Sequence, residues 1–413
     1  MKTMRWEVSQ LLMDCLKRNE PDFDDSRLEN LSLEDWQDFL EIAKAQRVIP
    51  LLWHRLKQKG LNESIPVNNA EVLIQALRMN TMRNMTLYGE LKNLLSILNS
   101  EGRPLILLKG IFLANSVYEN LGLREMNDID VLARPEDVER IVDILKSMGY
   151  SSSEFIFSEA MFRTLRHVPR MIKSEQGVGF EIHWTLTKPD ETFVGAKDLW
   201  ERAVPIDIFG CKAMTLSPED LLLHICQHTS HQHLFEFGLR PFCDISEIID
   251  KIKPKIDWEI ITELTFKSGC HKGVYMALRL AKDLVGADIP SDVLKRIMPI
   301  DMTETVLTAC RAQVLSDKSF IASMPVPFVK LLESGSLWEK IRIFWNQLFL
   351  PKAVIASQYS VPMDSIRIYG YYPLRFIDLF RRHWQTFTKY QQKDEGLKPI
   401  SERKILIADW LEH

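Results

Sequence analysis

The sequence predicts an α+β protein, in which a small mixed sheet with helices is flanked by N-terminal and C-terminal helical regions. Apolar residues recur three and four apart over residues 1–100 and again over residues 216–413, as on amphipathic helices. Between these regions, residues 101–215 mix short strand-like runs with helical runs, which is typical of a compact core of helices and strands. We therefore expect three parts with these boundaries.

The ends of several elements can be predicted from local signals. Residues 32–35 (Ser-Leu-Glu-Asp) form a helix-capping pattern, and residues 105–108 are expected to form an apolar strand after a proline. A helix is expected over residues 111–121, with the following glycine as its stop. A further helix is expected over residues 135–148, opened by a proline and ended by a glycine.

The second half of the core contains the remaining strand signals. Residues 179–184 (Gly-Phe-Glu-Ile-His-Trp) alternate in the strand period, and residues 204–214 resemble a hairpin. Residues 217–220 (Ser-Pro-Glu-Asp) then predict a helix start, where the helical pattern returns.

Composition excludes several classes of protein. The net charge of −4 gives no general basic field, which argues against nucleic acid as the main partner. The six cysteines are scattered without a Cys-x-x-Cys pair, which argues against a disulfide framework. The chain has no run apolar and long enough to cross a bilayer and no signal-peptide pattern, so we expect a cytoplasmic protein. Residues 371–384 are aromatic and basic, but we expect a packing helix there rather than peripheral contact with a membrane.

Two carboxylates indicate where the chemistry lies. Asp128 and Asp130 are two residues apart in an apolar run, so they share one face of a strand and repel each other unless a cation lies between them. Mg²⁺ prefers such oxygens, with Mn²⁺ as a substitute. Glu181 is the expected third ligand, because Asp190 and Glu191 fall in an expected loop. Two such ions can stabilise both the attacking and the leaving oxygen at phosphorus.

A turn and two basic residues are candidates for phosphate contact. Gly110 lacks a side chain at an expected helix start, where a backbone N–H can approach a phosphate. Lys109 and Arg124 would add positive charge there. The alternatives are a solvated Lys109 at a strand end and a structural ion pair of Arg124 with Glu119 or Glu125.

Histidines form the other candidate group. His183 follows the third carboxylate by two residues on the same strand face, where a structural role and a catalytic role both remain open. A second run has the spacing of one helical stripe, at His224, His228 and His231. Zinc binding with Cys243 or Asp244 is the less favoured interpretation, since no His-Glu-x-x-His is present. We expect a packed helix with His228 facing the substrate, and Asp244 orienting a histidine or an acceptor hydroxyl.

These motifs resemble the nucleotidyltransferase superfamily with the polymerase-beta-like fold, and within it the bacterial uncharacterised nucleotidyltransferase family. The resemblance covers roughly residues 35–250. The matching motifs are Leu108-Lys109-Gly110, Tyr118, Arg124-Glu125-Met126-Asn127-Asp128-Ile129-Asp130-Val131-Leu132, Gly149-Tyr150 and Glu181-Ile182-His183-Trp184. The chain departs from the superfamily at the phosphate turn, where Ile111 follows Gly110 and no serine is present.

The resemblance implies an enzyme that transfers a nucleoside monophosphate from an NTP, with ATP the expected nucleotide, and releases pyrophosphate. Two Mg²⁺ ions would be its cofactors. The acceptor would be a hydroxyl or similar group on a small molecule or peptide, whose identity is not implied. The missing serine motivates an alternative, a nucleotide-binding sensor with no turnover. Modification of RNA or of a protein is the other alternative, and the acidic balance argues against RNA.

Overall fold

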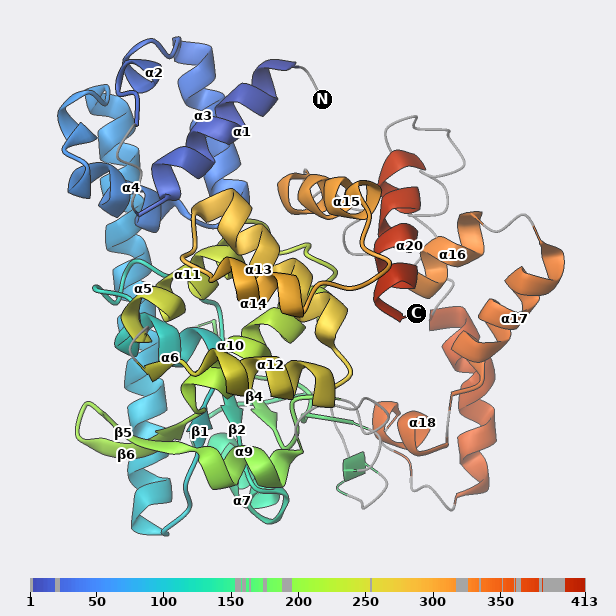
Figure 1. Cartoon of the computed structure of the whole chain (residues 1–413). Coiled ribbons are helices and arrows are strands. Elements are labelled where there is room, and N and C mark those ends of the chain that lie inside the picture. Colours follow the sequence, from blue (N-terminus) through green and yellow to red (C-terminus); the bar gives the residue numbers. More distant parts are fainter. Residues whose placement is uncertain are drawn as a thin grey trace.

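The computed structural model describes residues 3–18, 23–152, 157, 161–162, 165–173, 177–187, 195–252, 255–316, 326–333, 336–350, 352–359, 361, 365–378, 381 and 398–412. Figure 1 shows helices α1–α4 at one end of the molecule, the sheet at the other, and α15–α20 to one side. Asp190 and Glu191 lie outside the described residues, as do residues 382–384 of the aromatic, basic segment.

The sheet is mixed, as the sequence predicts. Its six described strands run in the spatial order β3-β4-β2-β1-β6-β5. The pairs β2–β4 and β1–β6 are parallel, and the other neighbours are antiparallel. The bounds are β1 Ile106–Leu107, β2 Ile129–Leu132, β3 Met171–Lys173, β4 Val178–His183, β5 Val204–Ile208 and β6 Cys211–Thr215. The strand over residues 179–184 and the hairpin over residues 204–214 are thus present, within one or two residues of their expected ends.

Helices precede the sheet in the chain, and the last of them packs against it. Their bounds are α1 Thr3–Leu16, α2 Ser26–Glu29, α3 Leu33–Ala45, α4 Ile49–Gln58 and α5 Val67–Ser100. The expected cap of α3 is a full capping box, since Ser32 Oγ accepts from the Asp35 N–H and the Asp35 carboxylate accepts from the Ser32 N–H. The long helix α5 runs beside the sheet and contacts β4 and β6.

The helices between the strands include one that is shorter than expected. Helix α6 spans Lys109–Ser116 rather than reaching residue 121, whereas α7 (Val138–Ser147) and α9 (Ala196–Arg202) complete this part. The amide nitrogens of Asn80 and Asn84 on α5 donate to backbone carbonyls of residues 121–124 and hold that segment as a loop. Gly122 is not a helix stop. A Cβ there would lie 1.9 Å from Thr81 Oγ1, so glycine permits the close approach of α5.

After the sheet, the described residues form mainly helices. Ser217 caps α10 by accepting the Asp220 N–H. The bounds are α10 Pro218–Gln227, α11 Arg240–Ile252, α12 Trp258–Lys267, α13 His271–Val285, α14 Ser291–Arg296, α15 Glu304–Leu315, α16 Val326–Glu333, α17 Leu337–Leu348, α18 Lys352–Gln358 and α20 Lys398–Glu412. Helices α10, α11 and α13 pack on one another, and α15 packs on α20.

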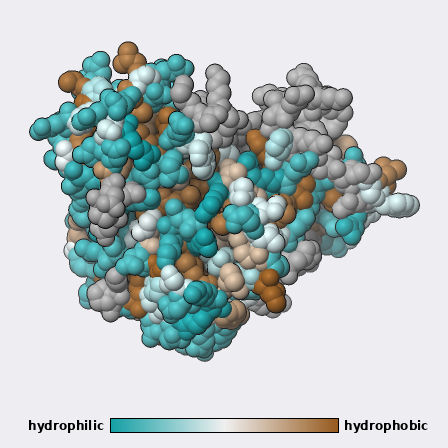
Figure 2. Space-filling model, turned by 45° about the horizontal axis from the view of Figure 1, so that its top comes forward, coloured by the Kyte–Doolittle hydropathy of each residue, from teal (hydrophilic) through white to brown (hydrophobic). Residues whose placement is uncertain are grey.

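Apolar side chains from the N-terminal helices, the sheet and helices α10–α15 form a continuous buried core. On the face shown in Figure 2, hydrophilic residues cover most of the surface, and hydrophobic residues occur singly or in small groups. Among the described residues, no helix combines the length and the apolar character needed to span a bilayer.

Candidate active site

Two carboxylates and a histidine meet where strands β2 and β4 lie side by side. Asp130 on β2 and Glu181 on β4 are direct register partners, and His183 follows on the same face of β4. One ligand atom from each of these residues can be chosen so that all lie within 4.8 Å of one another. The fold thus gathers two of the predicted metal ligands and adds the imidazole of His183 to them.

Asp128 lies immediately before β2, lines the same cavity as these groups and is half-buried. Burial raises its pKa, and the nearby charges of Asp130 and Glu181 raise it further. Arg170 Nη2, at 3.8 Å from Asp128 Oδ2, offsets this only in part. The electrostatic repulsion that the sequence predicts between these carboxylates is therefore present in the fold.

Among these acids, Asp130 has its negative charge most fully balanced by neighbouring groups. Lys109 Nζ lies 2.8 Å from Asp130 Oδ1, and His183 Nε2 lies 3.2 Å from the same oxygen. Burial alone would raise the pKa of Asp130, but Lys109 and His183 outweigh burial and hold it well below its usual range. His183 Nε2 also lies 3.6 Å from Glu181 Oε2, and its contact lowers the pKa of Glu181. Lys109 is therefore not a solvated residue at a strand end.

The glycine at the start of α6 has a different neighbour from the one expected. A Cβ on Gly110 would lie 2.3 Å from Arg124 Nη1 and 3.1 Å from the Cβ of Met126. The absence of a side chain thus makes room for the guanidinium of Arg124. The expectation that a backbone N–H approaches a phosphate here stays a prediction.

Arg124 pairs with neither glutamate that the sequence suggested. Its Nε donates to Asp244 Oδ1 at 2.8 Å and its Nη2 to Asp244 Oδ2 at 2.7 Å, a bidentate pair between buried side chains. Tyr118 Oη donates to Asp244 Oδ1 at 2.7 Å. Burial would lower the pKa of Arg124, but the charge and hydrogen bonds of Asp244 raise it above its usual value. Asp244 thus orients an arginine, not a histidine.

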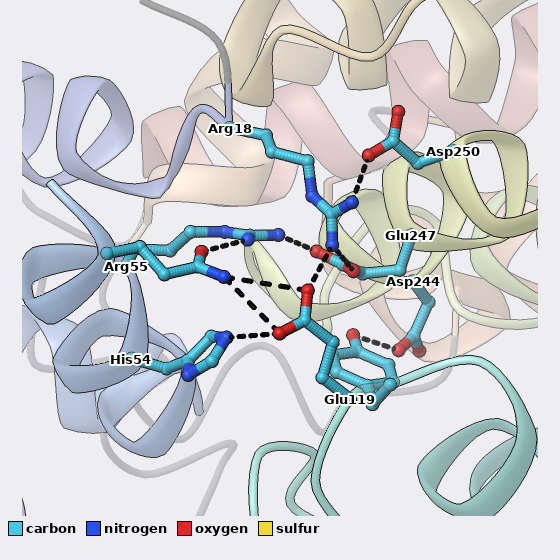
Figure 3. Close-up of polar contacts among 9 residues, drawn as sticks. Arg18, His54, Arg55, Glu119, Asp244, Glu247 and Asp250 are labelled. Carbon is cyan, nitrogen blue, oxygen red and sulfur yellow. Dashed lines mark hydrogen bonds and ion pairs between the residues drawn. The ribbon is translucent and has the colours of Figure 1, made fainter.

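A network of charged side chains fixes helix α11, which carries Asp244, against the N-terminal helices (Figure 3). Glu247, one turn beyond Asp244, pairs with Arg55 of α4 and with Arg18 Nη2 at 3.1 Å. Arg18 also reaches Asp250, and Arg18 Nη2 and His54 Nε2 both contact Glu119. These contacts set the position of Asp244 and, through it, that of Arg124.

All nine residues predicted for the site line one cavity of about 300 Å³. They are Lys109, Gly110, Arg124, Asp128, Asp130, Glu181, His183, His228 and Asp244. These residues are spread over more than a hundred positions of the chain, so it is the fold that brings them to one cavity. Their chemical roles remain predictions.

The run of histidines does not form one helical stripe. Helix α10 ends at Gln227, and residues 228–232 form a π-helical turn that rotates the later side chains away. His228 faces the cavity and His224 is buried with both ring nitrogens lacking a hydrogen-bond partner, whereas His231 packs near Gly273. The described residues bring no metal cluster together here.

Several lining residues were not predicted. Arg47 follows α3, Arg166 and His167 precede β3, Phe237 precedes α11 and Arg240 is the first residue of α11. His167 and His183 have ring centroids 5.0 Å apart. No local pattern marks these side chains, because they come from three separate segments of the chain and only the fold makes those segments neighbours.

Another wall of the cavity carries stacked rings. The ring centroids of His228 and His233 are 4.4 Å apart, and those of His233 and Phe237 are 4.0 Å apart. Burial lowers the pKa of His228 well below its usual value and that of His233 to about 4, so both rings are neutral near pH 7. They therefore present an uncharged aromatic surface beside the charged groups.

Comparison with known proteins identifies a family to which the chain is similar. The model of the uncharacterised nucleotidyltransferase family matches residues 32–286, more than half of the 413 residues. Searches of curated proteins and of solved structures found no significant match. The match runs from the capping residue of α3 to the end of α13 and so includes the sheet and every residue of the cavity named above. The chain therefore belongs to the uncharacterised nucleotidyltransferase family.

Proposed function

We propose that this chain is a divalent-metal-dependent nucleotidyltransferase that takes the nucleoside monophosphate of an NTP, ATP first among them, and releases pyrophosphate. The observation that carries the proposal is the pairing of Asp130 with Glu181 across two parallel strands, with Asp128 in the same cavity. Family membership supports transfer of a nucleotidyl group in general terms.

The donor set fits a hard divalent cation. Carboxylate oxygens of Asp128, Asp130 and Glu181 would hold it, with His183 beside them, and the raised pKa of Asp128 indicates unbalanced negative charge there. Two Mg²⁺ ions, or Mn²⁺ in their place, would supply Lewis-acid stabilisation of the oxygens at the reacting phosphorus. In our proposal, Lys109 exchanges its contact with Asp130 for one with phosphate when the cation binds.

The stacked rings of His228, His233 and Phe237 give the proposal a place for the nucleobase. Neutral aromatic faces stack on any base, which is worth about 1–3 kcal/mol per base in nucleic-acid complexes. The acceptor would be a small molecule or peptide with a hydroxyl or similar group. RNA is disfavoured by the net charge of −4.

One observation favours a second candidate, a nucleotide sensor without turnover. The ammonium group of Lys109 already neutralises Asp130 at 2.8 Å, so the carboxylates are partly satisfied without a metal ion. If that ion pair persists with nucleotide bound, the chain would bind an NTP and not transfer from it.

The test measures binding and turnover separately. Calorimetry with each of the common NTPs and Mg²⁺ gives binding, and pyrophosphate release in the presence of acceptor-containing cell extract gives turnover. The variant is Asp130→Asn. Its control is Asp220→Asn, which removes a buried carboxylate that pairs with Arg202 outside the cavity. We expect Asp130→Asn alone to abolish turnover. Binding without pyrophosphate release would identify a sensor, and the absence of both would refute the proposal.

A further inference from the structure

The cavity has a positive end that the carboxylates do not explain. Arg47, Arg124 and Arg240 line it from three separate segments, the loop after α3, the loop before β2 and the start of α11. The carboxylates lie on β2 and β4 and immediately before β2. Lys109 touches Asp130, and its neighbour Gly110 lies against the guanidinium of Arg124. The first two residues of α6 therefore contact both groups, the carboxylates through Lys109 and the arginines through Gly110.

Specific contacts hold the arginines together. The buried side chain of Gln46 accepts the N–H of Leu239 at 2.9 Å, which places the next residues, Arg47 and Arg240, beside each other. The carbonyl oxygen of Glu125 accepts from Arg240 Nη1 at 3.1 Å and from Arg124 Nη1 at 3.5 Å. The guanidinium groups of Arg124 and Arg240 thus converge on one acceptor.

The charges at this end are incompletely balanced. Asp244 neutralises Arg124, and the carboxylate of Glu125 lies 3.8 Å from Arg47 Nε. Among the described residues, Arg240 has a carbonyl partner and no carboxylate in an ion pair, and its Nε is buried without a hydrogen-bond partner. Burial together with the charges of Arg124 and Arg47 lowers the pKa of Arg240 to about 10. An anion in the cavity would relieve this repulsion.

The backbone at Arg47 gives independent evidence that its side chain matters. Arg47 has φ of +59°, in the left-handed region, at the end of α3. The Val48 N–H donates to the Ala43 carbonyl and the Arg47 N–H to the Lys44 carbonyl, which is the Schellman arrangement in which glycine is usual. An arginine there is strained by about 1 kcal/mol or more. The fold therefore tolerates a cost at the position from which the guanidinium reaches the cavity.

We propose that Arg47 and Arg240, with Arg124 oriented by Asp244, form a binding site for phosphate groups, namely the terminal phosphates of the nucleoside triphosphate. This rests on the proposed function, which places the reacting phosphate at the carboxylates. The chemistry recognised is a phosphate anion. A phosphate on the acceptor has the same chemistry, so the experiment must separate these two sources.

The structure offers an unusually clean variant. In Arg47→Gly the guanidinium is removed, but glycine suits the left-handed backbone better, so the melting temperature should stay the same or rise. Arg240→Gln is the second variant. Arg296→Gln is the control, because Arg296 pairs with Glu259 at 2.7 Å outside the cavity. These variants test the site without relying on loss of the fold.

The probes are AMP, ADP and ATP with Mg²⁺, and tripolyphosphate and orthophosphate without nucleotide, all by calorimetry. For the wild-type chain, affinity should rise from AMP to ADP to ATP. Both cavity variants should bind ATP and tripolyphosphate about 10- to 100-fold more weakly, as expected for loss of a hydrogen bond between charged groups. Their AMP affinity and the control should change little.

Other results of these titrations would overturn the phosphate site or separate it from the proposed transfer. Equal weakening of AMP, ADP and ATP, or no weakening, would overturn the site. The site would also be overturned if the wild-type chain bound AMP, ADP and ATP with equal affinity, and if it bound orthophosphate at saturating ATP while the variants did not. The arginines would then bind a phosphate group of the acceptor. Loss of tripolyphosphate binding in the variants without any pyrophosphate release by the wild type would support the site while refuting transfer.

Discussion

Asp244→Asn should be the most informative single change for the stability of the site. The substitution keeps the shape of the side chain but removes the charge that balances Arg124, whose side chain is 7% exposed. Asp244 accepts two bonds from Arg124 and one from Tyr118, and an amide oxygen cannot accept all of them with its nitrogen facing the guanidinium. Breaking a buried ion pair from one side costs about 3–5 kcal/mol.

The assay is urea denaturation followed by circular dichroism, with the midpoint and slope compared between variants. Glu259→Gln is the matched control, because it breaks an arginine–carboxylate pair whose acid is 76% exposed and whose attraction is screened by solvent. Tyr118→Phe should cost an intermediate amount, about 1–3 kcal/mol, since one hydrogen bond to a charged group is lost. If Asp244→Asn proved no more destabilising than Glu259→Gln, the buried pair would not hold this part of the site in place.

Three further predictions concern the cavity and the histidines. In Gly110→Ala, the added Cβ would lie 2.3 Å from Arg124 Nη1. The affinity for ATP should therefore fall, and the free energy of unfolding should drop by about 1–3 kcal/mol. Unchanged ATP affinity in calorimetry and unchanged stability in urea denaturation would contradict this close approach. Asp130→Asn should weaken Mn²⁺ binding at least about tenfold by titration calorimetry, and unchanged affinity would place the metal elsewhere. Burial lowers the pKa of His231 to about 4, from about 6.5 when unfolded, so the neutral ring favours folding above pH 6.5 and that contribution is lost as the pH falls toward 4. His231→Gln should therefore flatten the fall of the melting temperature over this range in scanning fluorimetry, and a parallel curve would count against the assignment.

The elements near the carboxylates were predictable because their signals are local. The strand period places Asp128 beside Asp130, and the alternation around Glu181 predicts a strand with that side chain on one face. The structure has β4 around Glu181, and β2 includes Asp130 but begins one residue after Asp128. Capping residues such as Ser32 and Ser217 likewise act on their own helices, so their effect could be predicted without knowledge of the fold.

The failures have equally specific causes. Helix periodicity predicted that His224, His228 and His231 share a stripe, but a π-helical turn begins at His228 and changes the spacing. The helix expected to reach residue 121 ends at Ser116, and asparagines of α5 bind the carbonyl oxygens of the segment beyond it. Contacts from a distant segment such as these cannot be predicted from the residues of the element itself.

By itself, the sequence determined the order of helices and strands, the close spacing of two carboxylates at the start of a strand and the turn before α6, since each depends on residues a few positions apart. The tertiary structure alone decided that Glu181 pairs with Asp130 in register, that Arg124 is bound by Asp244, and that Arg47 and Arg240 meet in one cavity. These contacts join residues separated by tens to hundreds of positions. They exist because burying the shared core fixes the helices and the sheet against each other, and side-chain periodicity carries no information about that arrangement.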